Sequence, residues 1–333
     1  MITNNAKIVR FHQTGNADVL QIEEASIPSP IKDEVTIKVA AIGLNRAEVM
    51  FREGQYLETP VFPSRIGYEV SGVIEAVGEE VSSVKVGDRV STIPAFSIGQ
   101  YGVYGEYATV PEHAVTAYPD TLSPEEGTSI WMAYLTAYGA LIELAQTKPG
   151  DHVLITAASS SVGLASIQIA KTEGAVVIAT TRTATKKQFL LDAGADHVIV
   201  TNDEDLEERV HNITNAAGMN VVFDPVGGPS VETLAKASAN QGILIEYGAL
   251  SPEPTPYPLF TSLQKGLSIR GYTLFEITKD PERLARGKAY LYDKFATSAL
   301  QPIIDRTFVF DEIVDAHKYM ESNVQRGKIV VTV

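Results

Sequence analysis

Residues 155–171, ITAASSSVGLASIQIAK, decide the fold of this chain. An apolar run typical of a buried strand leads into a group of small residues, and an apolar pattern with helical spacing follows. A turn from a strand into a helix leaves free N–H groups at the helix start, where the helix dipole adds partial positive charge. The stretch therefore predicts a strand, a phosphate-binding loop and a helix, with serine in place of glycine in the loop.

Small side chains in this loop would allow a pyrophosphate to come close to the backbone. Ser160, Ser161 and Val162 carry that expectation, and Gly163 would let the helix pack closely against the strand. Serine offers a hydroxyl donor, but it lacks the freedom of glycine at positive φ. Taken alone, the stretch suits an ordinary turn equally well, so the rest of the chain has to decide.

Strand and helix patterns alternate after residue 150. Apolar runs typical of buried strands recur at 152–158, 176–180, 197–200, 221–228 and 242–250. Short connections between such elements imply a parallel sheet with right-handed crossovers. The expected fold class is therefore α/β with a doubly wound Rossmann sheet, and the position of the serine-rich turn at its head favours phosphate binding there.

The first part of the chain has a different pattern. Short alternating or apolar runs lie at 35–44, 70–78 and 88–96, and turns separate them. They predict a β-rich, partly barrel-like domain. A helical pattern with a Ser N-cap signal follows over 123–146 and precedes the strand–helix repeats.

The second strand of the repeats distinguishes between dinucleotides. Sites for NAD usually carry an acidic residue about 20 residues beyond the phosphate loop, where it binds the ribose 2′-hydroxyl. This chain has Thr180 and Thr181 there, followed by Arg182 and Lys186. Hydroxyl, guanidinium and ammonium groups would bind a 2′-phosphate. The cofactor expected is therefore NADPH, and the alternative is a solvated helix start with ordinary basic residues.

Composition excludes several classes of function. The chain has 333 residues, no cysteine and a net charge of −14, so disulfides, thiolate nucleophiles and cysteine-ligated zinc are impossible. The acidic charge and the lack of Lys/Arg runs argue against nucleic acid as a partner. No apolar stretch reaches the roughly 18 residues that span a bilayer, and the start lacks signal-peptide features. The sequence predicts a cytoplasmic protein with no membrane partner.

The chain resembles the medium-chain dehydrogenase/reductases along nearly its whole length, and most of all their zinc-free quinone oxidoreductase-like branch. The segments that carry the resemblance are GLNRAEVMFREGQY, GYEVSGVIEAVG, KVGDRV, YGEYATVP, AASSSVGLASIQIAK and FDPVGG. The resemblance implies a GroES-like catalytic domain over residues 1–125, a Rossmann NADP-binding domain over 126–272 and a return to the catalytic domain over 273–333.

Zinc-dependent members of the superfamily hold the metal with a cysteine in the first motif and a histidine beside a glutamate in the second. This chain carries Asn45 and Tyr68 at those positions, and its histidines show no metal-ligand spacing. The resemblance therefore implies no metal. Without a Lewis acid, the remaining chemistry suits reduction of an already activated acceptor, which means a quinone or a double bond conjugated to a carbonyl.

The resemblance also implies roles for single residues. Tyr56 matches a tyrosine whose phenol would donate to the oxygen of the acceptor, and Asn45 offers an amide donor near nicotinamide or substrate. Tyr68 and Glu69 are expected to be structural. The implied cofactor contacts are Thr136, Ser160, Ser161, Val162, Gly163, Thr181, Arg182, Lys186, Thr201, Gly248, Leu250 and Lys328.

These observations favour an NADPH-dependent, zinc-independent enzyme that transfers hydride to a quinone. An enone or enoyl reductase is the alternative, because it needs nearly the same pocket. An alcohol dehydrogenase is less favoured, since the metal ligands are missing, and a non-catalytic NADPH-binding protein is a further alternative. The family pattern also implies a homodimer joined through an edge strand at 267–275.

Overall fold

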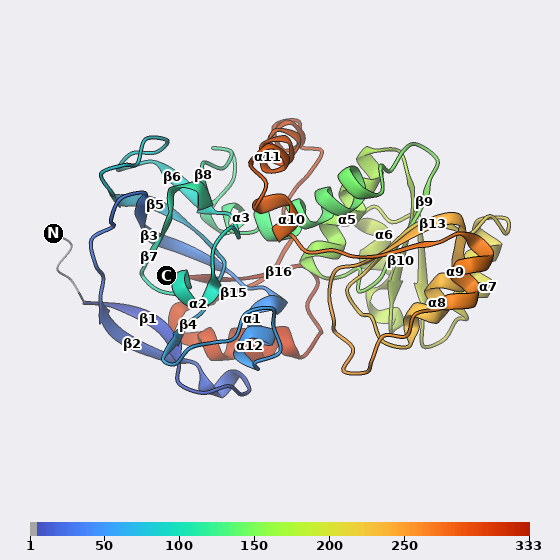
Figure 1. Ribbon diagram of the computed structural model, residues 1–333, viewed down its shortest axis with the longest axis horizontal. Helices are drawn as coiled ribbons and strands as arrows, with labels where there is room; N and C mark the ends of the chain where they lie inside the picture. The colour runs from blue at the N-terminus through green and yellow to red at the C-terminus, as the bar shows by residue number, and fades with distance from the viewer. Residues whose placement is uncertain (1–4) are drawn as a thin grey trace. The chain divides into compact units, whose positions relative to one another are not determined.

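The computed structural model describes residues 5–333, and the chain divides into two compact units (Figure 1). The first unit runs to Met132 and resumes at Pro302–Val333, and the second covers Ala133–Gln301. The sequence placed the boundaries between the two units after residues 125 and 272. In the structure the boundaries follow residues 132 and 301, and residues 273–301 therefore belong to the second unit. The reason is the long helix α11 (Pro281–Ala296), whose inner face packs there, with the Phe295 ring 5.1 Å from that of Tyr134.

The first unit is built mainly from strands. Its larger, seven-stranded sheet has the order β15-β16-β3-β5-β6-β8, with β7 paired to β3, and a smaller sheet has the order β2-β1-β4. The strands are β1 (Asn5–Phe11), β2 (Gln21–Ser26), β3 (Glu34–Gly43), β4 (Ser64–Arg65), β5 (Glu69–Val77), β6 (Arg89–Thr92), β7 (Tyr107–Pro111), β8 (Val115–Thr116), β15 (Ile304–Val309) and β16 (Lys328–Thr332). The β-rich first domain expected from the alternating runs is thus confirmed.

Strand β16 joins the two separated parts of this unit. It pairs antiparallel with β3, with Val330 opposite Gly43, and parallel with β15. Its residues Lys328, Ile329, Val330 and Val331 are all buried. The first residue of β16 therefore lies beside the end of β3, and helix α1 (Arg46–Arg52) begins three residues after that end.

Short helices complete the first unit. Ser123 caps α3 (Pro124–Gly127) by accepting a hydrogen bond from the Glu126 N–H, and the Glu126 carboxylate accepts from the Ser123 N–H. This capping box is the helix start that the sequence predicted. Helix α3 ends after four residues, and helical turns resume over residues 131–144, within the predicted range. The remaining helices of the unit are α1, α2 (Ile98–Tyr101) and α12 (Ile313–Glu321).

The second unit contains a six-stranded, wholly parallel sheet of order β11-β10-β9-β12-β13-β14. Because the order reverses between β9 and β12, the sheet is doubly wound, as the strand–helix alternation predicted. Its strands are β9 (His152–Ile155), β10 (Val176–Thr181), β11 (His197–Val200), β12 (Met219–Asp224), β13 (Ser238–Glu246) and β14 (Ser268–Gly271).

Helices cover this sheet in two groups. Helix α5 (Ser161–Thr172) packs on β9 and β10, while α7, α8 and α9 lie next to one another beside β13 (Figure 1). Leu154, Ile178 and Leu244 from the strands and Val210 and Leu234 from the helices share one buried apolar cluster. The helices not yet given bounds are α4 (Thr136–Tyr138), α6 (Lys187–Asp192), α7 (Leu206–Ile213), α8 (Ser230–Ala237), α9 (Leu259–Lys265) and α10 (Phe275–Thr278).

None of the helices within residues 5–333 combines the length and the apolar character that crossing a membrane requires.

Candidate active site

The serine-rich turn in the second unit forms a capped helix start. Ser160 is the N-cap of α5, and its hydroxyl accepts a hydrogen bond from the Gly163 N–H at 3.0 Å. The left-handed position of the turn, at φ +45°, falls on Ala157 rather than on a serine. Serine in place of glycine therefore carries no backbone strain at residues 159–161, and their N–H groups lie at the positive end of the α5 dipole.

Glycines make two close approaches around this edge of the sheet. A Cβ on Gly163 would lie 2.6 Å from the carbonyl oxygen of Ala158, so α5 could not start so near β9. A Cβ on Gly248 would lie 2.7 Å from the carbonyl oxygen of Pro225. Leu250 donates its N–H to that same oxygen at 3.0 Å and is 38% exposed. These positions leave backbone, rather than side chains, facing the ends of β9, β12 and β13.

A basic group lies directly on the serine-rich turn. The Lys186 ammonium donates to the Ser159 hydroxyl at 3.0 Å. Thr181 ends β10 and is buried, while Arg182, which follows it, is exposed. Thr201 donates its N–H to the Thr181 carbonyl at 2.8 Å. The structure thus brings together four of the residues predicted to contact the cofactor, at the carboxyl ends of β10 and β11.

A carboxyl pair missed by the sequence analysis ends β12 and β13. Asp224 lies opposite Glu246 in the parallel pairing, and its carboxylate accepts from the Thr156 hydroxyl and from the Gly227 N–H. Burial, and then the charge of Asp224, raise the pKa of Glu246 to about 9. Glu246 is therefore neutral at pH 7. The available signal was an acidic residue closing each of two apolar runs, VVFD and ILIE.

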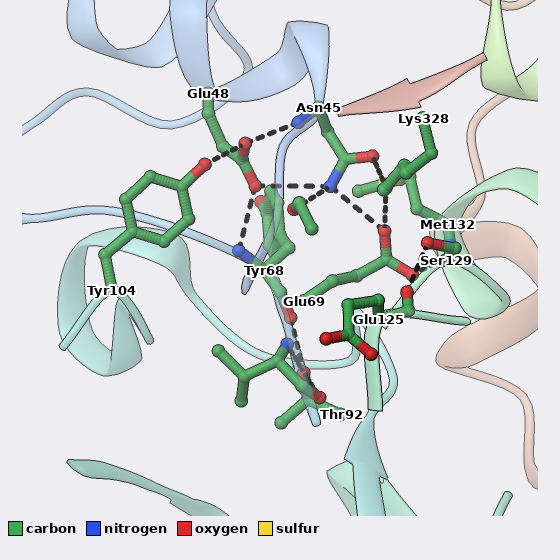
Figure 2. A network of polar contacts seen from close by, with 12 residues as sticks. Asn45, Glu48, Tyr68, Glu69, Thr92, Tyr104, Glu125, Ser129, Met132 and Lys328 are labelled. Atoms are coloured by element: carbon green, nitrogen blue, oxygen red, sulfur yellow. Dashed lines mark hydrogen bonds and ion pairs between the residues drawn. The ribbon is translucent and has the colours of Figure 1, made fainter. Parts of the chain in front are cut away.

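A buried polar network occupies the first unit (Figure 2). Asn45 lies 6% exposed between β3 and α1. Its amide nitrogen donates to Glu69 Oε2 at 3.1 Å and to the Gly43 carbonyl at 3.2 Å, and its amide oxygen accepts from the Lys328 ammonium at 2.7 Å. The sequence proposed Asn45 as a donor to nicotinamide or substrate, and in the structure both polar atoms of its amide form hydrogen bonds with other residues of the protein.

The centre of the network is an ion pair. Lys328 Nζ lies 2.5 Å from Glu69 Oε2, and each side chain is 1% exposed. The other oxygen of Glu69 accepts from the Met132 N–H at 2.8 Å. Lys328, which the sequence assigned to the cofactor, thus points into this network within its own unit. A buried pair with these extra hydrogen bonds is costly to break, because either partner alone would be an unpaired buried charge.

Glu48 extends the network toward two tyrosines. Burial raises the pKa of its carboxyl to about 7. Neighbouring groups lower that pKa and so limit the rise, among them the Tyr104 hydroxyl, which donates at 2.5 Å, the Asn45 N–H, which donates at 2.6 Å, and the charge of Lys328. Its second oxygen accepts from the Tyr68 N–H at 3.0 Å. The hydrogen bond between Glu48 and Tyr68 therefore links the network around the ion pair to Tyr68, which contacts Tyr56.

Tyr56 is half-buried and lies against the fully buried Tyr68. The Tyr68 hydroxyl donates to the Tyr56 oxygen at 3.5 Å, with ring centroids 6.4 Å apart. Burial raises the pKa of both phenols. Tyr56 thus stays protonated across the physiological range and can serve as a hydrogen-bond donor. Thr136, also predicted as a cofactor contact, is buried in α4 of the second unit.

Two family models match the chain: the alcohol dehydrogenase GroES-like domain over residues 31–120 and the zinc-binding dehydrogenase over residues 161–286. Quinone oxidoreductase of Lama guanicoe is 32% identical over 329 residues, which cover 98% of this chain and 97% of that protein. The chain belongs to the medium-chain dehydrogenase/reductases. Its place is among their quinone oxidoreductase-like members, as the sequence motifs predicted.

Solved structures of this family agree with the fold. Escherichia coli quinone oxidoreductase complexed with NADPH matches with a TM-score of 0.90 at 28% identity, over 98% of this chain and 100% of that chain. The CurK enoyl reductase matches with a TM-score of 0.88 at 27% identity, over 99% of each chain. The chain is thus an oxidoreductase that uses an NAD(P)-type cofactor. The capped turn, the two close-packed glycines and the basic group on Ser159 fit such a dinucleotide.

The residues present do not fit the zinc that one family description names. Asn45 and Tyr68 stand where the zinc-dependent members carry ligands, and the Lys328 ammonium already lies on Asn45 and Glu69. A cation between these two groups would have to displace a buried positive charge. Within residues 5–333, no group of three or more acidic or histidine side chains is arranged to hold a metal ion.

Proposed function

We propose that this enzyme uses NADPH to reduce a quinone without a metal ion. The observation that carries the proposal is the Lys328–Glu69–Asn45 network, which takes up the polar groups around the motif positions of zinc ligands. Without a Lewis acid the enzyme needs an acceptor that is already electron-poor. The likeness to quinone oxidoreductases over nearly the whole chain supports a quinone as that acceptor.

The choice of NADPH rests on the carboxyl end of β10. No acidic side chain stands at Thr180 or Thr181, and Arg182 and Lys186 follow. A carboxylate would bind the ribose 2′-hydroxyl of NADH, whereas these cations match a 2′-phosphate. Support also comes from the E. coli quinone oxidoreductase, whose structure is complexed with NADPH.

For the reaction we assign Tyr56 as the hydrogen-bond donor to the acceptor oxygen. The bound cofactor supplies a hydride from nicotinamide C4. Negative charge then develops on the acceptor oxygen, and a neutral phenol with a raised pKa stabilises it by donating a hydrogen bond. Asn45 and Lys328 hold the surrounding backbone by their buried bonds. Thr136, Thr201, Gly248 and Leu250 remain proposed contacts of the cofactor.

An enone or enoyl reductase is the second candidate, because the CurK enoyl reductase shares the fold over 99% of both chains. Reduction of a conjugated double bond needs the same hydride and the same donor to a carbonyl oxygen. The two candidates differ in the acceptor alone, so an acceptor panel decides between them.

The test is NADPH oxidation, followed by its near-ultraviolet absorbance, with quinones, enones and aldehydes as acceptors. We expect consumption with quinones and no change on adding a chelator. Turnover with enones only would replace the first candidate by the second. Loss of activity with the chelator would contradict the metal-free mechanism. Tight NADPH binding without turnover of any acceptor would contradict both candidates and favour a non-catalytic NADPH-binding protein.

We also propose a cytoplasmic homodimer. Strand β14 is an edge of the parallel sheet, so its outer backbone groups can pair with a second copy. Exposed apolar side chains lie just before it in the chain, with Phe260 84% and Leu263 71% exposed. Sedimentation velocity tests this assembly, and a monomer at micromolar concentration would contradict it.

A further inference from the structure

Tyr68 is held in place through both its backbone and its ring. Its N–H donates to Glu48 Oε1 at 3.0 Å, and its carbonyl accepts from the Thr92 hydroxyl at 2.8 Å. Its side chain is 1% exposed, and its ring lies 5.7 Å from that of Phe96. Both backbone polar groups and the ring are thus fixed, which leaves the direction of the phenol hydroxyl determined by the fold.

That hydroxyl is aimed at Tyr56. The two phenol oxygens are 3.5 Å apart, with Tyr68 as donor and the ring planes at 64°. A phenol has one proton to donate and an oxygen that accepts. When Tyr68 donates to the Tyr56 oxygen, the Tyr56 proton has to point elsewhere. Because Tyr56 is half-buried and Tyr68 is enclosed, Tyr56 is the member of the pair that a ligand can reach.

We propose that Tyr68 is a positioning residue for Tyr56: by donating to the Tyr56 oxygen it directs the Tyr56 O–H toward the carbonyl oxygen of the acceptor. The proposal rests on the proposed function of Tyr56. Donation to a phenol oxygen also polarises that phenol's own O–H, so Tyr56 is a stronger donor than it would be without Tyr68.

Burial and the neighbouring carboxylates act on the Tyr56 pKa in one direction, and the hydrogen bond from Tyr68 acts in the other. Burial raises the pKa of Tyr56 most, the hydrogen bond from Tyr68 lowers it, and the carboxylates of Glu48 and Glu58 raise it. Glu58 is held nearby by the Ser97 hydroxyl at 2.6 Å and the Gly99 N–H at 3.0 Å. Tyr56 therefore stays protonated, and Tyr68 is the neighbour that increases its acidity.

The test is Tyr68→Phe, which keeps the ring and removes only the hydroxyl. We expect kcat with the best acceptor to fall roughly 3- to 10-fold, which is the effect of losing one neutral hydrogen bond, while the Kd for NADPH is unchanged. The pKa of Tyr56 should rise. It is read from tyrosine labelled with ¹³C at Cζ, with the signal assigned through Tyr56→Phe. Tyr101→Phe is the matched control, because Tyr101 joins the same aromatic group but donates to Glu34.

A double-mutant cycle separates positioning from packing. If Tyr68 acts through Tyr56, the double variant is no slower than Tyr56→Phe alone. The proposal would be overturned if Tyr68→Phe lowered kcat by the same factor in the Tyr56→Phe background as in the wild-type enzyme. It would also be overturned if the pKa of Tyr56 did not change in Tyr68→Phe. If none of the acceptors supports NADPH oxidation by the wild-type enzyme, the proposed function fails. The ¹³C titration then still decides whether Tyr68 controls the pKa of Tyr56.

Discussion

Replacing Lys328 by methionine tests the buried network most directly. Methionine fills most of the space of the lysine stem but carries no charge. The change leaves the Glu69 carboxylate, 1% exposed, without its partner at 2.5 Å, and it removes the donor at 2.7 Å from the Asn45 oxygen. Removing one member of a buried ion pair costs about 3–5 kcal/mol. We therefore expect the free energy of unfolding of the first unit to fall by about that amount.

A single tryptophan makes this measurement specific. Trp131 is the only tryptophan of the chain, and it is buried in the first unit, where its indole N–H donates to the Ser91 hydroxyl at 2.8 Å. Urea unfolding followed by tryptophan fluorescence therefore reports on that unit. The matched control is Lys318→Met, since the Lys318–Asp18 pair is exposed on both sides and such pairs contribute about 0–1 kcal/mol.

The pairing of Lys328 with Glu69 also predicts how a double variant should behave. Adding Glu69→Gln to Lys328→Met removes the unpaired buried charge, so the double variant should be more stable than Lys328→Met alone. A loss in Lys328→Met no larger than in Lys318→Met would refute the reasoning. So would a double variant whose loss equals the sum of the two single losses.

Three further predictions concern the second unit. Arg182→Ala and Lys186→Ala should each raise the Kd for NADPH far more than that for NADH in fluorescence titrations, and equal effects on both would contradict the 2′-phosphate assignment. Ser160→Ala should cost about 1 kcal/mol in urea unfolding by loss of the α5 cap, with Ser160→Gly costing only a few tenths. Glu246→Gln should raise the Tm at pH 8 but not at pH 4. The carboxyl titrates near 4.5 when unfolded and near 9 when folded, so its stabilising effect is lost as pH rises through that window. An equal gain at both pH values would rule out this titration.

The sequence predicted the fold because local patterns carry most of it. Alternating strand and helix patterns after residue 150 imply a parallel sheet wherever connections are short, and the structure has that sheet. The sequence left the serine-rich turn open to two interpretations because serine lacks the freedom of glycine at positive φ. The structure places positive φ on Ala157, which no local pattern indicates.

Contacts between distant residues could not be predicted in the same way. Glu69 and Lys328 are 259 positions apart, and only the pairing of β16 with β3 brings them together. The resemblance implied a cofactor contact for Lys328, and no local pattern around Lys328 indicates that it lies beside Glu69. The anchoring of Tyr68 likewise depends on Glu48, 20 residues away, and on Thr92, 24 residues away. Apolar periodicity specifies a face, but it does not specify which polar partner meets it.

The position of β16 has a consequence for how the chain folds during synthesis. This strand lies between β15 and β3, yet it follows the whole of the second unit along the chain. The second unit is continuous, so a ribosome delivers it complete while the first unit still lacks two strands. Until then one edge of β3 is unpaired, and the carboxylate of Glu69 lacks its cationic partner. The first unit is therefore the slower of the two to fold, and it is the one that a chaperone would be expected to protect.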